Sequence, residues 1–277
     1  MADERPPEEI IEYYGHGAER GRLLGGEGEL ERVRTQELLG RYLPPAPAVV
    51  CDVGGAAGVY ACRLAEQGYE VHLVDPVPLH VEQAREASAA QPEHPLASVQ
   101  VGDARGLPFE DSSADAVLLL GPLYHLTERD DRVQALREAR RVLKGGGVVL
   151  AAGISRFASV LDGLLKGFLG DPAFVHIVER DLAEGQHRNP TGRPGYFTTA
   201  YFHHPEEMAG EFTDAGLQHE ATLAVEGPGW CAQPFADYWE DEARREQLLM
   251  AVRLLESEPS ILGATGHMMA VGRKASD

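Results

Sequence analysis

The sequence predicts an α/β fold built on a doubly wound, mostly parallel sheet. Short apolar runs alternate with amphipathic stretches over residues 48–153, and each run is rich in β-branched residues or leucine. Such runs fit strands that are buried on both faces, and the stretches between them fit helices that cover the sheet. A chain of 277 residues is long enough for one such domain with added helical parts.

The apolar runs give the positions of the expected strands. Five strands are predicted in the core, at 48–53, 69–75, 97–102, 115–121 and 147–153. Two later apolar segments predict further strands at 218–226 and 266–273, which bring the sheet to seven strands.

Helices are expected between most of the strands, at 58–67, 79–90 and 128–143. After residue 153 the alternation breaks, and two amphipathic helices followed by the turn-rich HRNPTGRPGYF are typical of a cap. The apolar stripes of these two helices are Ile154, Phe157, Leu161, Leu164, Leu165 and Phe168, and then Phe174, Ile177, Val178 and Leu182. A helix at 205–215 begins with proline in its first turn, and 235–256 is predicted to be one long helix.

The expected organisation therefore has four parts. Residues 1–47 form an N-terminal lid and the first core helix, and 48–153 form the core. Residues 154–200 are a helical cap insertion, and 201–277 complete the core around an inserted helix at about 227–262.

Charge and cysteine content argue against several classes of protein. Lys and Arg total 25 against 44 Asp and Glu, a net charge of −19, which would repel nucleic-acid phosphates. Cys51, Cys62 and Cys231 are widely spaced and odd in number, so no disulfide framework or paired-cysteine site is expected. The acidic start MADERPPEEIIEYY is unlike a targeting segment, and no apolar run approaches the roughly 18 residues of a membrane span. We expect a cytoplasmic protein without nucleic-acid or membrane partners, and leave a homodimer open.

The turn after the first strand is the most informative segment. The strand VVCDV carries Asp52 and is followed by the glycine-rich turn GGAAG, residues 54–58, which opens a helix. Glycine lets a ligand approach backbone N–H groups, and a helix N-terminus favours a negative group. A dinucleotide fingerprint would need glycines where Ala56 and Val59 stand, so a pyrophosphate ligand is less favoured.

This segment resembles motif I of the class I S-adenosylmethionine-dependent methyltransferases, in which an acidic and an apolar residue precede alternating glycines. Gly54, Ala56 and Gly58 stand at the glycine positions, with Gly55 between the first two. The resemblance implies a Rossmann-like methyltransferase fold and S-adenosyl-L-methionine as the cofactor. It also implies a place for Asp52 near the amino-acid end of that cofactor.

Later segments stand where the family has its other motifs. Asp75 and Pro76 end the second strand, where the family's carboxylate accepts the ribose hydroxyls. Asp103 and Ala104 follow the third strand, where the family holds the adenine with an acidic side chain and the next backbone N–H. Gly121 begins GPLYHL, which stands at the motif that faces the transferring methyl. The last two strands look like the family's terminal antiparallel pair.

The implied activity is metal-independent transfer of a methyl group to an oxygen or nitrogen of a small-molecule acceptor. Alignment of an acceptor with an activated methyl can contribute about 7–11 kcal/mol, and a general base typically adds a further factor of about 10²–10⁴. GPLYHL and AAGIS, at the fourth and fifth strand ends, lack the carboxylate cluster of metal-dependent relatives. The alternatives are a nicotinamide-dependent oxidoreductase and a non-catalytic protein that binds S-adenosylmethionine or S-adenosylhomocysteine.

Two histidines are candidates for the acceptor side of the site. His125 follows the fourth strand and is the first candidate base, with Tyr124 shaping the pocket; the alternative is that His125 caps the next helix or packs under the cap. His203 is a candidate catalytic-site residue that contacts the substrate, because an extended segment puts it on the same face as Tyr201; the alternative is a solvated histidine at a helix start.

The N-terminal region offers two further candidates. Tyr14, or Tyr13 beside it, is expected to close over the cofactor, and ordinary helix packing is the alternative. Arg34 is placed to reach the cofactor carboxylate, or else pairs with Glu31 or Glu37 along its helix.

Overall fold

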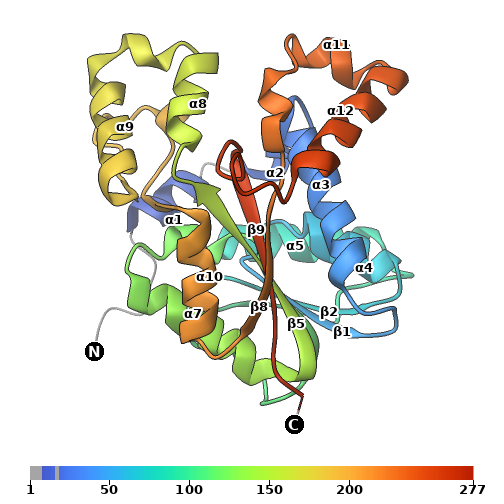
Figure 1. Cartoon of the computed structure of the whole chain (residues 1–277). Coiled ribbons are helices and arrows are strands. Elements are labelled where there is room, and N and C mark those ends of the chain that lie inside the picture. The colour runs from blue at the N-terminus through green and yellow to red at the C-terminus, as the bar shows by residue number, and fades with distance from the viewer. Residues whose placement is uncertain (1–7, 16–18, 277) are drawn as a thin grey trace.

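The computed structural model describes residues 8–15 and 19–276. The parts of the expected lid at 1–7 and 16–18 lie outside the described residues. A twisted sheet lies at the centre, helices cover both of its faces, and two groups of helices rise above one edge (Figure 1).

Within the described chain, the sheet has nine strands, and seven of them lie in the order β3–β2–β1–β4–β5–β9–β8. Among these seven, β9 is antiparallel to both of its neighbours and the others run parallel, so the predicted seven strands and their mostly parallel arrangement are confirmed. The strands are β1 (Val49–Val53), β2 (Glu70–Asp75), β3 (Ser98–Val101), β4 (Ala114–Leu119), β5 (Leu143–Ser155), β8 (Gln218–Ala224) and β9 (His267–Arg273). β7 (Ala200–His203) adds to the end of β5 and pairs with the short β6 (Gln186–His187).

Helices pack on both faces of the sheet, which makes the fold doubly wound. One apolar cluster joins the sheet to α3 (Glu27–Tyr42), α4 (Val59–Glu66) and α5 (Pro78–Ala90). A second cluster joins the other face to α7 (Arg129–Val142) and α10 (Pro205–Asp214). Burying apolar side chains on both faces explains why the strands read as nearly continuous apolar runs.

Two lobes stand above the sheet (Figure 1). The cap lobe contains α8 (Ala158–Leu165) and α9 (Pro172–Glu184), and the second lobe contains α11 (Phe235–Trp239) and α12 (Glu242–Leu255). The prediction of one helix over 235–256 is wrong, because the helix is interrupted between α11 and α12. The Asp241 carboxylate accepts the backbone N–H of Arg244 at 2.9 Å, and such a cap favours a new helix start.

The predicted stripe of the first cap helix is wrong in part. Ile154 belongs to β5, whereas Phe157 and Leu164 are 39% and 62% exposed. α8 instead buries Ser159 and Gly163. The stripe of α9 is buried as predicted except for its last member, Leu182, with the buried residues being Phe174, Ile177 and Val178.

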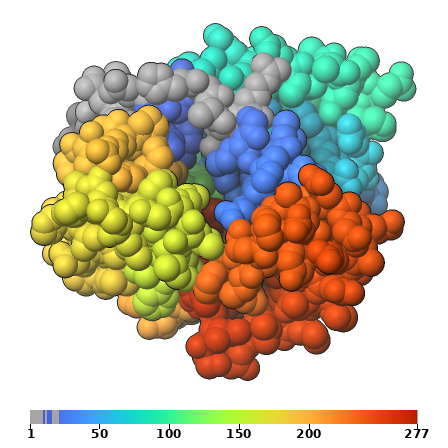
Figure 2. All heavy atoms as spheres, turned by 90° about the horizontal axis from the view of Figure 1, so that it is seen from above, coloured from blue at the N-terminus to red at the C-terminus, as the bar shows by residue number. Residues whose placement is uncertain are grey.

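Seen from above, the cap lobe in yellow and the second lobe in orange border a hollow, with N-terminal helices in blue on a third side (Figure 2). These helices include α2 (Glu19–Arg22) and α3, and α1 (Glu8–Gly15) precedes them. None of the helices in the described ranges combines the length and the apolar character needed to cross a membrane.

Candidate functional site

A first cavity of about 310 Å³ lies over the carboxyl ends of β1, β2 and β4. A second cavity of about 450 Å³ lies between the lobes. Among the described residues, five line both cavities, and we call this set the junction: Tyr14, Arg22, Glu31, Tyr124 and His267.

The glycine turn after β1 forms one wall of the first cavity. Gly54 has a φ of +72°, and a Cβ there would lie 2.6 Å from Cδ of Pro122. A Cβ on Gly55 would lie 2.7 Å from the Asp52 carboxylate. There is therefore no room for a side chain at Gly54 or Gly55. With glycine at both positions, a ligand in the cavity can approach the backbone of the turn. Gly58 does not line this cavity; it is the N-cap residue immediately before α4, with a φ of 84°.

Asp52 lies under this turn and is 1% exposed. Within the described part of the chain, neither carboxylate oxygen has a hydrogen-bond partner, although the residue lines the first cavity. Burial, and secondarily the charge of Asp75, raises the pKa of Asp52 to about 7. A buried carboxylate without a partner at a cavity wall is suited to a ligand that brings a hydrogen-bond donor.

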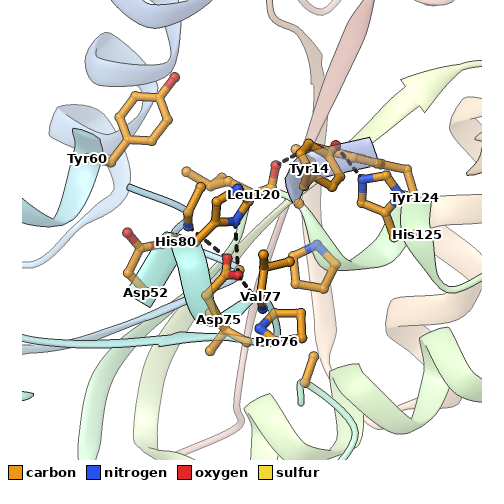
Figure 3. Close-up of a pocket in the computed structure, with 18 of the residues that line it drawn as sticks. Tyr14, Asp52, Tyr60, Asp75, Pro76, Val77, His80, Leu120, Tyr124 and His125 are labelled. Atoms are coloured by element: carbon orange, nitrogen blue, oxygen red, sulfur yellow. Dashed lines mark hydrogen bonds and ion pairs between the residues drawn. The ribbon is translucent and has the colours of Figure 1, made fainter. Parts of the chain in front are cut away.

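Asp75 fixes the turn from the neighbouring strand (Figure 3). One carboxylate oxygen accepts the N–H of Ala56 at 2.9 Å. The other accepts the N–H of Val77 at 2.9 Å and Nδ1–H of His80 at 3.0 Å. Since a carboxylate offers about four lone-pair sites, Asp75 can still accept from a ligand.

Asp103 holds the loop after β3. Its carboxylate accepts Nε–H of Arg105 at 2.9 Å and the backbone N–H of the same residue at 2.8 Å, while Arg105 also pairs with Asp131 at 3.0 Å. Asp52, Asp75 and Asp103 all line the first cavity, so the structure brings the three predicted carboxylates together. Other predicted residues line it too, namely Gly54, Gly55, Ala56, Pro76, Ala104, Gly121, Tyr124, His125 and Tyr14.

Tyr14, a junction residue, is hydrogen-bonded to His125 (Figure 3). The carbonyl of Thr199 lies 3.2 Å from Nδ1 of His125 and can only accept, so Nδ1 carries the proton. Nε2 then accepts the Tyr14 hydroxyl at 2.7 Å. Burial lowers the pKa of His125 to about 4, so the ring is neutral at pH 7 and both nitrogens are engaged by the protein. The structure thus leaves His125 no ring nitrogen for an acceptor unless Tyr14 moves.

Arg34 does not reach the first cavity, and this prediction is wrong. Its side chain is fully buried, pairs with Glu37 and Glu256, and donates to the carbonyl of Val225 at 3.3 Å. The alternative, an ion pair with Glu37 along the helix, is the observed arrangement. Arg253 of α12 also pairs with Glu37, at 2.6 Å, so charged groups join α3 to the second lobe.

His203 lines neither cavity and is fully buried, so it is neither the expected substrate contact nor a solvated histidine. It does share a face with Tyr201, with ring centroids 4.8 Å apart, but that face packs against α7 and α10. Nε2 of His203 lies 3.4 Å from the Glu211 carboxylate, which also accepts Nε–H of Arg132 at 2.8 Å. Burial lowers the pKa of His203.

The sequence analysis missed a polar cluster at the junction. Nδ1 of His267 lies 2.6 Å from Oε1 of Glu226 and 3.8 Å from Oε2 of Glu31. Oε2 of Glu226 accepts the backbone N–H of His267 at 2.8 Å and lies 2.9 Å from the Thr265 hydroxyl. Glu31 pairs with Arg22. Burial lowers the pKa of His267, but the charges of Glu31 and Glu226 outweigh it and raise the pKa to about 9.

One sequence signal could have found part of this cluster. Glu226 follows β8 and His267 begins β9, and these strands are antiparallel neighbours. Polar residues at the facing ends of such a pair lie close together. Glu31 comes from α3, and no strand pairing predicts its position.

The second cavity has predominantly apolar walls. The lobes, α1, β7 and the segment after β4 contribute aromatic side chains, namely Tyr13, Tyr14, Tyr124, Phe174, Tyr196, Phe197, Phe202, Trp230 and Phe235. A concave site with aromatic walls and a few convergent polar groups is suited to a small organic molecule.

The known proteins that this chain resembles in sequence are methyltransferases. A methyltransferase domain family matches residues 51–151, which span β1 to β5 and contain the glycine turn. An uncharacterized methyltransferase of Mycobacterium tuberculosis is 34% identical over 123 residues, 43% of this chain and 46% of that protein. A ubiquinone/menaquinone biosynthesis C-methyltransferase of a Caulobacter species is 30% identical over 149 residues, 51% of this chain and 57% of the relative. The chain spans about half the length of the curated relatives it matches.

The fold likeness extends over most of the chain. An S-adenosylmethionine-dependent methyltransferase structure from Methanosarcina mazei aligns with a TM-score of 0.59 at 18% identity, covering 87% of this chain and 98% of that one. This likeness is one of fold, and it confirms the predicted Rossmann-like architecture.

Proposed function

We propose that the chain transfers a methyl group from S-adenosyl-L-methionine to a small-molecule acceptor. The match of residues 51–151 to a methyltransferase domain family supports this proposal. The observation that carries this proposal is the first cavity. It brings together the closely packed glycine turn and the carboxylates of Asp52, Asp75 and Asp103.

The donor groups of S-adenosylmethionine match these acceptors. The unpartnered Asp52 carboxylate is suited to the amino-acid end, Asp75 to the ribose hydroxyls, and Asp103 with the N–H of Ala104 to the adenine. The sulfonium and ammonium charges also favour a wall that is rich in carboxylates. A volume of about 310 Å³ falls at the lower end of the range typical of ligand sites.

The second cavity supports a small acceptor with an apolar body. S-adenosylmethionine, when bound, supplies an already activated methyl group, so the chain must mainly align the acceptor and exclude water. The aromatic walls of the two lobes are placed to do both.

We propose an oxygen or nitrogen acceptor and no metal. The polar side chains at the junction already have protein partners, since Glu31 pairs with Arg22, and Glu226 pairs with His267. The Caulobacter relative is named a C-methyltransferase, so carbon is the alternative to be tested.

The test is label transfer from S-adenosylmethionine carrying a radioactive methyl group, screened over metabolite extracts and a panel of aromatic alcohols and amines. We expect label in a small molecule, S-adenosylhomocysteine in equal amount, and a loss of at least about 100-fold for Asp75→Ala. Asp111→Ala, whose side chain is 77% exposed, is the control and should keep full activity.

Three outcomes would contradict the proposal in different ways. Label found only in tRNA or rRNA would exclude a small acceptor. Binding of S-adenosylhomocysteine without any transfer would favour a non-catalytic binding protein. Label on carbon, located by NMR of the product, would replace the oxygen or nitrogen acceptor.

A further inference from the structure

The junction contains the groups that can meet both a methyl donor in the first cavity and an acceptor in the second. Four of its five side chains are engaged by partners other than His267. Arg22 and Glu31 pair with each other, and the Tyr14 hydroxyl donates to His125. The Tyr124 hydroxyl donates to the carbonyl of Leu120 at 3.2 Å. The remaining junction side chain is His267, which is 23% exposed.

The His267 ring is held in one orientation. Nδ1–H donates to Glu226, and the other oxygen of that carboxylate accepts the backbone N–H of His267 itself. The Glu226 carboxylate is thereby fixed from two sides. In the neutral ring the lone pair is then on Nε2, and no bond from Nε2 to another described residue is present.

His125 lacks this arrangement. Both of its ring nitrogens are engaged, by the carbonyl of Thr199 and the hydroxyl of Tyr14, and no carboxylate orients it. A general base must reach the proton that it removes, and it works best when a further group orients it.

We propose that His267, oriented by Glu226, is the general base that takes the proton of the acceptor. In the step, the acceptor oxygen or nitrogen forms its bond to the methyl carbon. The carbon–sulfur bond breaks, and its electron pair stays on sulfur. The acceptor proton passes to Nε2 of His267, so charge is balanced by the imidazolium beside Glu226. This inference rests on the proposed methyl transfer and adds the residue that handles the proton.

The charged surroundings of His267 predict a pH profile. Glu226 after β8 and Glu31 of α3 face the ring, Arg22 of α2 lies beyond Glu31, and Tyr124 of α6 (Pro122–His125) has its ring centroid 6.4 Å away. The pKa of His267 is raised to about 9, so the basic form is gained as pH rises through 9. We therefore expect kcat to increase about tenfold per pH unit between pH 6 and 8 and to level off above pH 9. A base with the pKa of His125, about 4, would give a flat profile over this range.

The experiment compares His267→Gln and Glu226→Gln with wild type. The matched controls are His176→Gln and Glu179→Gln, because this pair is a solvent-exposed histidine and glutamate 3.2 Å apart on α9. Rates with phenol and 4-nitrophenol are measured from pH 6 to 10. Independently of any acceptor, the histidine Cε1 signals are titrated by NMR with S-adenosylhomocysteine bound, and the signal lost in His267→Gln identifies this residue.

We expect His267→Gln to lower kcat for phenol by at least about 100-fold with little change in KM, and to lower it less for 4-nitrophenol, which ionises more readily. The His267 signal should titrate near pH 9 and move toward its ordinary value of about 6.5 in Glu226→Gln. Both controls should behave as wild type.

The proposal is overturned if His267→Gln keeps the wild-type pH profile, or if the His267 signal titrates below pH 7 and Glu226→Gln leaves it unchanged. Inactivation by a chelator that a divalent cation reverses would also overturn it. When phenols are not methylated, the NMR titration decides the proposal. Failure of wild type to bind S-adenosylhomocysteine would instead refute the proposed function.

Discussion

The carboxyl group of Asp52 links the stability of the ligand-free protein to pH. Its pKa of about 7 lies above the ordinary value of 3.8, so the fold favours the protonated form, and this stabilisation is lost as pH rises through 7. Asp52→Asn keeps the shape and removes the buried charge. We expect it to be more stable than wild type at pH 8.5, by up to about 4 kcal/mol, with little difference at pH 4.

Urea denaturation of the two proteins at both pH values measures this difference, and calorimetry should show weaker S-adenosylhomocysteine binding by Asp52→Asn. Asp111→Asn, at an exposed site, should show no such pH dependence. If the free energies of unfolding of Asp52→Asn and wild type differed by the same amount at pH 4 and pH 8.5, the raised pKa of Asp52 would be contradicted.

The positions of some other site residues could be predicted from the sequence, and those of others could not. Asp75 and Asp103 were predictable, because each follows a recognisable strand and parallel strands end at one edge of a sheet. The partner of His125 was not, because Tyr14 is 111 residues away in the chain. The alternation of side chains paired Tyr201 with His203 correctly but could not tell which of the two faces is turned toward α10.

At the scale of elements, the β1–α4 turn offers a sharp test. Gly55→Ala would bring a Cβ to 2.7 Å from the Asp52 carboxylate and 2.8 Å from the Leu73 side chain. Overpacking of this kind costs about 1–3 kcal/mol, so we expect the Kd for S-adenosylhomocysteine to rise about tenfold or more. Calorimetric titration measures the change.

The matched control is Gly40→Ala in α3, where nothing lies within 4 Å of the added Cβ. Alanine favours a helix interior over glycine, so this variant should gain about 0.5–1 kcal/mol of stability and bind with unchanged affinity. Equal affinities for the two variants would show that the turn does not border the ligand.

The elements of the core were predictable and the lobes were less so. β1 and β2 begin and end within a residue or so of the apolar runs at 48–53 and 69–75, because a strand buried on both faces must be apolar throughout. β5 is longer than its run, since pairing with β9 and β7 extends it to Ser155. In the lobes, apolar side chains such as Leu164 remain exposed, so apolar spacing alone does not identify the packed face of α8.

At the scale of the whole molecule, the charge distribution predicts which ligand stabilises the fold. S-adenosylhomocysteine at about 100 times its Kd should add about 2.7 kcal/mol, which raises the Tm of a chain of this size by roughly 5–10 °C. NADH should give no shift, because its pyrophosphate would face three carboxylates in a chain of net charge −19. Thermal-shift measurements with both ligands test this, and stabilisation by NADH alone would favour an oxidoreductase.

The ionic contacts between α3 and the second lobe constrain how acceptor selectivity can be redesigned. α3 supplies Glu31 to the junction, and its buried Arg34 depends on Glu256, which follows α12. A foreign segment grafted over 235–256 would remove Glu256 from this buried guanidinium and leave it with Glu37 and the Val225 carbonyl, and breaking a buried ion pair costs about 3–5 kcal/mol. In chimeric proteins made from this chain, the second lobe and α3 should therefore be exchanged together.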